Sequence, residues 1–367
     1  MSARSGPPFR ADHVGSLLRP EALRVARRQF AAGALDRAGL AAVEDREIER
    51  LIKRQQDVGL RSVTDGELRR SWWHLDFLWG LDGVSRHVMD AGVAFAGVNT
   101  RTEGVRIDGK IGFSGHPMLA HYAFLQAHTR ATPKLTIPSP SALCGRPVLP
   151  PIDAAAYSDR DQLFADLGTA YRDAVSAFAA AGCRYLQLDE VFIAMLCDAA
   201  YREKMRLRGD DPDRLLHLYA ELINTAIADI PADMTVTLHL CRGNFKSTYM
   251  GAGGYETVQD VLFNAINVHG YFMEYDDERS GGFEPLRLLP KGKTVALGIV
   301  TTKQGVLESS DSLERRIDEA ARFVPREQLC LAPQCGFSST EEGNLLTEDE
   351  QWAKLERIVA VAARVWG

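Results

Sequence analysis

Four residues of kinds that bind metal ions stand where short apolar runs of this sequence end. His239 and Cys241 are two positions apart at the end of one run, Glu274 ends the next, and Cys335 follows the last run of this kind. Alternate side chains of a strand share one face, so His239 and Cys241 would point the same way. One imidazole, two thiolates and one carboxylate complete a tetrahedral ligand set for Zn²⁺. The sequence therefore predicts a zinc site formed by these four residues.

The same residues also fit roles that involve no metal. Cysteine is among the most buried residues, so Cys241 and Cys335 would also suit a core, and Glu274 would also suit a charged surface. A zinc site of this composition would act on thiols. Two thiolates and a carboxylate carry more charge than Zn²⁺, so a substrate thiol bound there would lose its proton and stay electron-rich. This favours activation of a thiol nucleophile over hydrolysis, for which neutral histidine ligands hold a water.

Eight short apolar runs would place these residues, and stretches with the helical spacing of apolar residues separate them. Strands that alternate with helices pair in parallel, and eight such units predict a TIM (β/α)8 barrel, whose active sites lie at the carboxyl ends of the strands. An open doubly wound sheet is the alternative, but the first turn lacks the glycine-rich segment typical of that fold. The predicted strands are Arg10–Val14, Arg61–Thr64, Pro133–Ile137, Tyr185–Leu188, Met234–Leu240, Tyr271–Glu274, Thr294–Ile299 and Leu329–Ala332. The predicted helices cover residues 20–33, 37–58, 70–79, 117–128, 160–181, 213–228, 255–266, 311–323 and 348–366.

One segment does not fit a simple barrel. Residues 82–115 are rich in Gly and Val and alternate in polarity. Such alternation is typical of strands, so we expect an inserted β-hairpin in the connection after the second strand. No linker-like segment divides the chain, and residues 1–367 are expected to form a single domain that carries this insertion.

Composition and charge exclude several classes of protein. The 43 Lys and Arg residues and 49 Asp and Glu residues give a net charge of −6, which argues against a nucleic-acid binder because such proteins carry a basic face. No apolar run approaches the roughly 18 residues that predict a membrane span, and the first nine residues lack the apolar region of a secretory signal. Six cysteines in 367 residues are too few for a disulfide scaffold. We expect a cytoplasmic enzyme that acts on small molecules, with a homo-oligomer as one option.

Several short motifs together resemble one known family. The motifs are Val14-Gly-Ser16, Asp65-Gly-Glu67, Leu186-Gln-Leu-Asp-Glu190, His239-Leu-Cys241, Glu274 and Ala332-Pro-Gln-Cys-Gly-Phe337. In this order they resemble the catalytic C-terminal barrel of the cobalamin-independent methionine synthase family, including its zinc ligands. The resemblance covers nearly all of the chain and leaves no room for the second barrel of the long enzymes in that family. It implies a single-barrel zinc enzyme that transfers a methyl group to L-homocysteine and forms L-methionine.

The resemblance also implies which residues hold the amino-acid part of homocysteine. Ser16 would hold the carboxylate, and Glu67 and Asp189 would hold the amino group. Each lies at the end of a predicted strand, where an acidic side chain that faces a pocket is costly unless it binds something. Glu67 could instead pair with a neighbouring arginine at the surface, and Asp189 could instead favour the start of a helix.

Two segments depart from the family pattern. Residues 137–141, Ile-Pro-Ser-Pro-Ser, stand where the family has the tryptophan that stacks on folate, and Lys303 stands where it has a catalytic histidine. The half of the site that activates the thiol is thus kept, whereas the half that holds the methyl donor is altered. Lys303 or Asp189 would assist the leaving group as an acid, and turnover of polyglutamylated methyl-folate is expected to be weak.

Three functions remain consistent with these residues. The first is methyl transfer to homocysteine from a donor that the sequence does not identify. The second is another zinc-dependent thiol alkyl transfer or a carbon–sulfur bond cleavage, as in the related epoxyalkane–coenzyme M transferases. The third is a non-catalytic protein that binds zinc or an amino acid. Near Glu67, the aromatic segment Trp72-Trp73-His74 either walls the substrate pocket or packs in the core.

Overall fold

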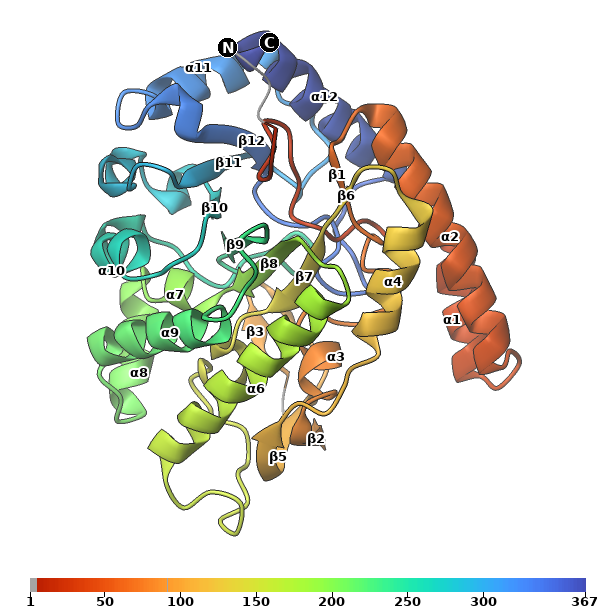
Figure 1. Ribbon diagram of the computed structural model, residues 1–367, viewed down its shortest axis with the longest axis vertical. Helices are drawn as coiled ribbons and strands as arrows, with labels where there is room; N and C mark the ends of the chain where they lie inside the picture. The colour runs from red at the N-terminus through yellow and green to blue at the C-terminus, as the bar shows by residue number, and fades with distance from the viewer. Residues whose placement is uncertain (1–4, 91) are drawn as a thin grey trace.

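A computed structural model describes residues 5–90 and 92–367 of the chain and confirms the predicted barrel (Figure 1). The strands, in chain order, are β1 (Ser62–Val63), β2 (Asp82–Val88), β3 (Ala94–Phe95), β4 (Val98–Asn99), β5 (Glu103–Gly112), β6 (Thr132–Pro133), β7 (Leu135–Pro138), β8 (Tyr185–Glu190), β9 (Thr235–Leu240), β10 (Gly270–Glu274), β11 (Thr294–Val300) and β12 (Leu329–Pro333). Each of the eight predicted strands has a counterpart in this set or in the segment that precedes β1.

The barrel strands follow one another in parallel. Strands β7, β8, β9, β10, β11 and β12 form one sheet in that order, and β1 pairs with β6, which continues into β7 after Lys134. The first predicted strand bridges to the last, because Ala11 pairs in parallel with Leu331 of β12. On the other side, Asp12 accepts a hydrogen bond from Ser62 Oγ of β1 at 2.8 Å. The ring of strands therefore closes through the segment that leads to Ser16.

The helices surround the strands and cover the outside of the barrel (Figure 1). They are α1 (Glu21–Ala31), α2 (Arg37–Val58), α3 (Leu75–Leu78), α4 (Met118–His128), α5 (Ser141–Cys144), α6 (Arg160–Ala180), α7 (Phe192–Met195), α8 (Ala199–Leu207), α9 (Pro212–Ala226), α10 (Gln259–Asn264), α11 (Ser310–Ala320) and α12 (Glu348–Trp366). Four 3-10 turns accompany them: η1 (Tyr255–Thr257), η2 (Glu278–Ser280), η3 (Glu284–Leu288) and η4 (Arg326–Gln328).

Local capping explains where several helices begin. The spacing Thr347-Glu-Asp-Glu350 predicts a capping box, and these residues form one at the start of α12. The sequence also predicts helix caps at Ser158 and Asp311, and both are wrong by one or two residues. Helix α6 begins after Asp159 rather than Ser158, because the Asp159 carboxylate accepts the backbone N–H of Asp161. Helix α11 begins after Ser309, whose side chain accepts the backbone N–H of Ser312.

The predicted insertion is a β-excursion that lies beside the barrel. Strands β2 and β5 pair antiparallel, and the short strands β3 and β4 form a second hairpin between them. The excursion is tied to two barrel loops. The Phe95 ring packs against Phe245 in the loop after β9, with centroids 5.4 Å apart, and Arg101 pairs with Glu341 in the loop after β12 at 2.6 Å.

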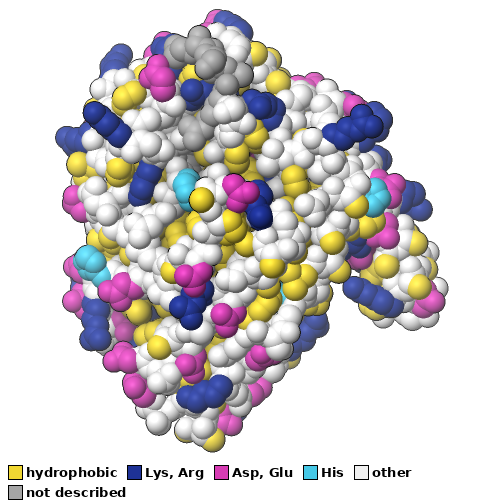
Figure 2. All heavy atoms as spheres, in the orientation of Figure 1, with side chains coloured by type: hydrophobic (Ala, Val, Ile, Leu, Met, Phe, Trp, Pro, Cys, Tyr) yellow, Lys and Arg dark blue, Asp and Glu magenta, His cyan; other side chains and the backbone are white. Residues whose placement is uncertain are grey.

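The barrel strands are buried on both faces, as expected for parallel strands covered by helices. Every residue of β8, β10, β11 and β12 is buried. Their residue type predicts that Cys144, Cys183, Cys197 and Cys330 are small core residues, and all four are buried. On the face shown in Figure 2, basic and acidic side chains are interspersed around the outline. Within the described residues, no helix combines the length and apolar character needed to cross a membrane.

Candidate active site

Three of the four predicted metal ligands come together at the carboxyl end of the barrel. His239 and Cys241 stand at the end of β9, and Cys335 follows β12; their ligand atoms all lie within 4.8 Å of one another. The Sγ atoms of Cys241 and Cys335 are 3.4 Å apart, and both thiols are free. His239 is only 2% exposed, yet neither of its ring nitrogens has a hydrogen-bond partner. A buried imidazole without partners is unusual, and one ion bound to all three residues would satisfy it, so this donor set fits Zn²⁺.

Glu274, the fourth predicted ligand, ends β10 and lies outside that group of three. Its Oε2 accepts the backbone N–H of Arg242 at 2.9 Å. Its Oε1 accepts hydrogen bonds from Arg279 at 2.7 Å and from Lys303 at 3.1 Å. Burial alone would raise the pKa of Glu274, but Lys303, Arg279 and Arg242 outweigh it and lower the pKa to about 2. The carboxylate is therefore ionised and held by cations in this structure.

Lys303, which follows β11, faces the acidic residues at the end of β10. Its Nζ donates to Asp276 Oδ2 at 2.7 Å as well as to Glu274. Burial would lower the pKa of Lys303, but the charges of Glu274 and Asp276 raise it above its usual value. The ammonium is therefore held as a cation against two carboxylates.

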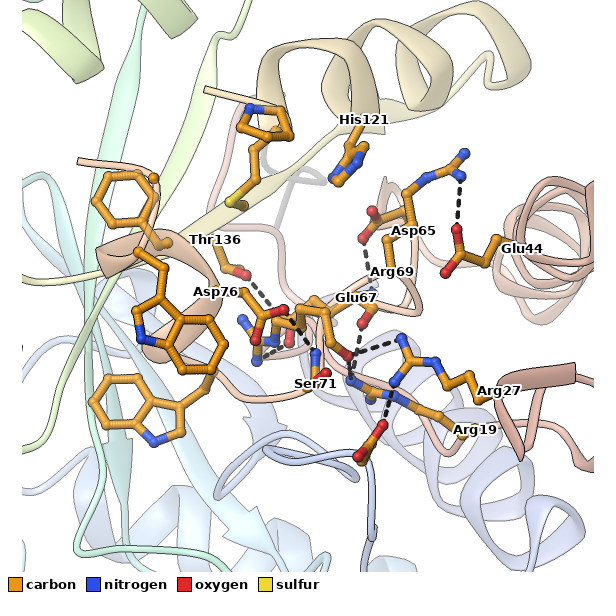
Figure 3. Close-up of a pocket in the computed structure, with 18 of the residues that line it drawn as sticks. Arg19, Arg27, Glu44, Asp65, Glu67, Arg69, Ser71, Asp76, His121 and Thr136 are labelled. Carbon is orange, nitrogen blue, oxygen red and sulfur yellow. Dashed lines mark hydrogen bonds and ion pairs between the residues drawn. The ribbon is translucent and has the colours of Figure 1, made fainter. Parts of the chain in front are cut away.

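Glu67 lies in the turn after β1 in an unusual backbone conformation. Its φ is 58°, a left-handed value that is uncommon outside glycine. Its Oε1 accepts a hydrogen bond from Thr136 of β7 (Figure 3). Its Oε2 pairs with Arg70. Gly15 permits this approach, since a Cβ there would lie 2.6 Å from Glu67 Oε1. Burial raises the pKa of Glu67 to about 7, although Arg70 opposes the change.

Asp189 and Ser16 face the same end of the barrel from two other segments. Asp189 lies in β8, where its Oδ1 accepts a hydrogen bond from Gln187 at 2.7 Å, and burial raises its pKa. Ser16 contacts the loop after β12: its Oγ accepts the backbone N–H of Ser338 at 3.3 Å. A Cβ on Gly336 would lie 1.9 Å from Ser16 Oγ, so glycine is required for this close approach.

One cavity of about 580 Å³ joins these residues, a volume typical of pockets for small ligands. The predicted site residues that line it are Ser16, Glu67, Asp189, His239, Cys241 and Cys335. Glu274 and Lys303 lie outside this lining. The insertion contributes one wall through residues that include Met89, Val93, Phe95 and Val105. The aromatic segment Trp72-Trp73-His74 lines the cavity, as expected if it forms a wall of the substrate pocket. Phe77, in contrast, packs in the core.

Some residues of the site were not predicted from the sequence. Asn244, three positions after Cys241, donates through Nδ2 to the carbonyl of Gly336 at 2.9 Å and so ties the loop after β9 to the loop after β12. Arg146, which follows α5, also lines the cavity. Their proximity to a strand end is the only signal that the sequence offers. Glu190, part of a predicted motif, is structural because it accepts the backbone N–H groups of Phe192 and Ile193 at the start of α7.

Glu67 also lines a second cavity, of about 890 Å³ (Figure 3). Glu67, Arg70 and Trp73 line both cavities. Many of the side chains in the second cavity are arginines, and two of them are bonded to the loops around Glu67. Arg19 donates to four backbone carbonyl groups, and Arg27 pairs with Glu341 at 2.6 Å. We therefore assign these arginines to holding the loops around Glu67.

Comparisons with known proteins identify the family to which this chain is similar. The sequence profile of the family described as the catalytic domain of cobalamin-independent synthase matches residues 9–364. The chain is 48% identical to the uncharacterized protein YxjH of Bacillus subtilis (strain 168), over 98% of this chain and 95% of that protein. It is 24% identical to 5-methyltetrahydropteroyltriglutamate–homocysteine methyltransferase of Mycobacterium leprae, over 98% of this chain and 43% of that enzyme. Among solved structures, a Listeria monocytogenes protein described as a candidate vitamin-B12 independent methionine synthase has a TM-score of 0.80 and 36% identity, over 99% of this chain and 100% of that one.

Proposed function

The chain belongs to the family of cobalamin-independent synthase catalytic domains, and from this membership we propose that it transfers a methyl group to the thiol of L-homocysteine and forms L-methionine. The observation that carries the proposal is the single cavity that brings His239, Cys241 and Cys335 together with the residues assigned to the amino acid. Residues 1–367 would act as one zinc-binding domain, with the insertion at about 82–115 forming a wall of the site.

His239, Cys241 and Cys335 would hold Zn²⁺, with Glu274 as the fourth ligand. The ion, when bound, supplies a positive charge that lowers the pKa of a substrate thiol and favours its thiolate. The charge state of Glu274 supports its part in this set, since Lys303 and Arg279 keep it ionised. Lys303 contacts Glu274 at 3.1 Å and does not line the cavity, so we propose that it acts by positioning Glu274.

The amino-acid part of homocysteine would bind along the wall formed by Ser16, Glu67 and Asp189. Both carboxyl groups are buried without a full set of partners: Glu67 and Asp189 each have a raised pKa because burial disfavours their charge. An ammonium group placed between them would offset that cost, because a hydrogen bond between charged groups is stronger than a neutral one. Asp189 faces the same cavity as the metal ligands and is the acidic group that we propose to assist the leaving group.

A second function, alkyl transfer to another thiol, is favoured by the region that follows β7. The residues there are Ser139, Pro140 and the short helix α5, with no aromatic side chain to stack on a flat ring. The altered donor half would suit a donor other than folate. The two candidate functions differ in the thiol that is bound, so a measurement of homocysteine binding distinguishes them.

Calorimetry on the zinc-loaded protein tests the proposal. Homocysteine should bind with release of a proton, because the bound form is the thiolate. The release is detected when the heat of binding differs between buffers of different ionisation enthalpy. Asp189→Asn should weaken homocysteine by about 10- to 150-fold, the loss of a charge-assisted contact, while the zinc content stays unchanged. Cys183→Ala serves as a control, since Cys183 is buried away from the cavity. Unchanged affinity in Asp189→Asn, or no proton release, would contradict the proposed thiol site.

A further inference from the structure

An arginine and a histidine that are not assigned to homocysteine meet in the wall of the candidate active site. Arg146 Nη2 lies 2.6 Å from His74 Nε2. His74 precedes α3, and Arg146 follows α5 at the end of β7. Both side chains line the cavity that also holds the metal ligands. The pair is therefore in reach of a second ligand in the same cavity.

The contact fixes the protonation state of His74. A guanidinium can only donate hydrogen bonds, so Nε2 of His74 has to accept, and the ring proton then sits on Nδ1. Burial lowers the pKa of His74 well below its usual value, and the charge of Arg146 lowers it further. His74 is 2% exposed, and its Nδ1 is buried with no hydrogen-bond partner. The ring thus carries a donor without an acceptor.

Arg146 also lacks an acidic partner. Within residues 5–90 and 92–367, no carboxylate is among the groups whose charge acts on its guanidinium. Burial lowers the pKa of Arg146 to about 10, so the group is still charged at neutral pH. Arg70, another arginine in this lining, pairs with Glu67 and is compensated. Arg146 is partly exposed, and its guanidinium contacts a neutral imidazole and no carboxylate, so an anion from solution would supply the missing opposite charge in a charge-assisted hydrogen bond.

The backbone at Arg146 is held in place by neighbouring elements. The Tyr201 hydroxyl donates to the carbonyl of Gly145, and Arg208 donates to the carbonyl groups of Cys144 and Arg146. On the other side of the contact, the His74 ring packs on Trp73 with centroids 4.5 Å apart. Positions fixed in this way favour binding, because little freedom is lost when a ligand arrives.

We propose that Arg146 and His74 bind a carboxylate group of the methyl donor. The nearby lining is apolar, with Leu143, Leu149 and Val105 among its side chains, so the body of the donor would be apolar. The inference rests on the proposed function, because Ser16, Glu67 and Asp189 are there assigned to homocysteine. In the transfer, the bond between the methyl carbon and the donor's leaving atom breaks and its electron pair stays on that atom. The methyl carbon bonds to sulfur, and the thiol proton is released to solvent.

A pair of probes that differ only in charge tests the anion site. 3-Phenylpropionate and 3-phenylpropionamide have nearly the same shape, and only the first carries a carboxylate. The zinc-loaded protein should bind the acid more tightly than the amide, and Arg146→Gln should weaken the acid about 10- to 150-fold without changing the amide. Arg146→Lys, which keeps the charge, should retain part of the preference. Arg86→Gln is the matched control, because Arg86 is exposed and rests on Trp79 outside this cavity.

The outcomes separate this inference from the proposed function. Saturating homocysteine should leave the binding of 3-phenylpropionate in place, and Arg146→Gln should leave homocysteine affinity unchanged, because the two groups occupy different subsites. Equal affinity for acid and amide, an unchanged preference in Arg146→Gln, or displacement of the acid by homocysteine would overturn the inference. If homocysteine does not bind but the acid preference depends on Arg146, the proposed function fails and the anion site stands.

Discussion

Replacing Glu67 by Gln is expected to change how the stability of the metal-free protein depends on pH. Burial raises the pKa of this carboxyl from 4.5 to about 7, against the opposing charge of Arg70. The side chain is 7% exposed and reaches Thr136 and Arg70. Ionising this carboxyl in the folded protein is costly, so it should lower the free energy of unfolding of the ligand-free protein at pH values where the carboxyl of the unfolded chain is ionised.

The sign follows from the two pKa values. Below pH 4.5 the carboxyl is protonated in both the folded and the unfolded chain. Between pH 4.5 and about 7 the unfolded chain releases the proton while the folded chain keeps it, so the free energy of unfolding falls as pH rises. At 1.36 kcal/mol for each pH unit between the two values, the loss amounts to roughly 3 kcal/mol. The Glu67→Gln variant has no carboxyl at this position and should not show that loss.

Urea unfolding at pH values below, within and above this window measures the difference. The free energy of unfolding of the wild type should fall relative to Glu67→Gln across the window and stay constant above it. Glu356→Gln is the control, because it removes an exposed carboxylate that pairs with Arg54 at 2.9 Å. Homocysteine added above the window should stabilise the wild type more than Glu67→Gln, since its ammonium favours the ionised carboxyl. Parallel curves for wild type and Glu67→Gln would refute the reasoning.

Two further predictions concern the metal and the donor. Cys241→Ala and Cys335→Ala should each abolish tight zinc binding. Glu274→Gln should weaken it less, because Glu274 lies outside the group of three residues that come together. Elemental analysis that finds a full content of zinc in both alanine variants would show that these cysteines are not metal ligands. Polyglutamylated methyl-tetrahydrofolate should be a poor methyl donor. Residues 139–144, directly after β7, include no aromatic side chain that could stack on folate, and Lys303 is bonded to Glu274 and Asp276. Consumption of homocysteine with this donor at roughly 1 s⁻¹ or faster, a rate typical of enzymes, would contradict the prediction.

Most barrel strands were predictable because they are short, largely apolar runs, whereas the first is polar and pairs only through a bridge at Ala11. Local chemistry also predicted the capping box at Thr347. Helices α5 and α7 were missed, since each has four residues and all of them are buried, which leaves no polar face to produce a helical pattern. The start of α11 was misplaced because Ser309 and Asp311 both suit a helix start, and the choice between them depends on the backbone.

The sequence indicates which residues of the site could bind a metal or a substrate, but it does not predict the contacts that their side chains make. His239 and Cys241 stand two apart on one strand, so their common face follows from the geometry of a strand. The pairing of Lys303 with Glu274 depends on side chains that reach across from β11 to β10, and no sequence pattern encodes it. Arg146 stands out only because no carboxylate lies beside it, a property of the folded chain. The left-handed backbone of Glu67 likewise has no signal in its residue type.

The closure of the barrel at Ser16 has a consequence for biosynthesis. Ser16 lies near the beginning of the chain, and its Oγ and carbonyl are bonded by Ser338 and Phe337, directly after Cys335. Chains emerge from the ribosome with the N-terminal part first, so Ser16 is synthesised 322 residues before Ser338, its partner in the loop after β12. His239 and Cys241 likewise lack Cys335, the third proposed metal ligand, until then. Capture of a metal by these three residues, and the folding free energy that would come with it, would therefore be a late event, open only to chains synthesised past β12.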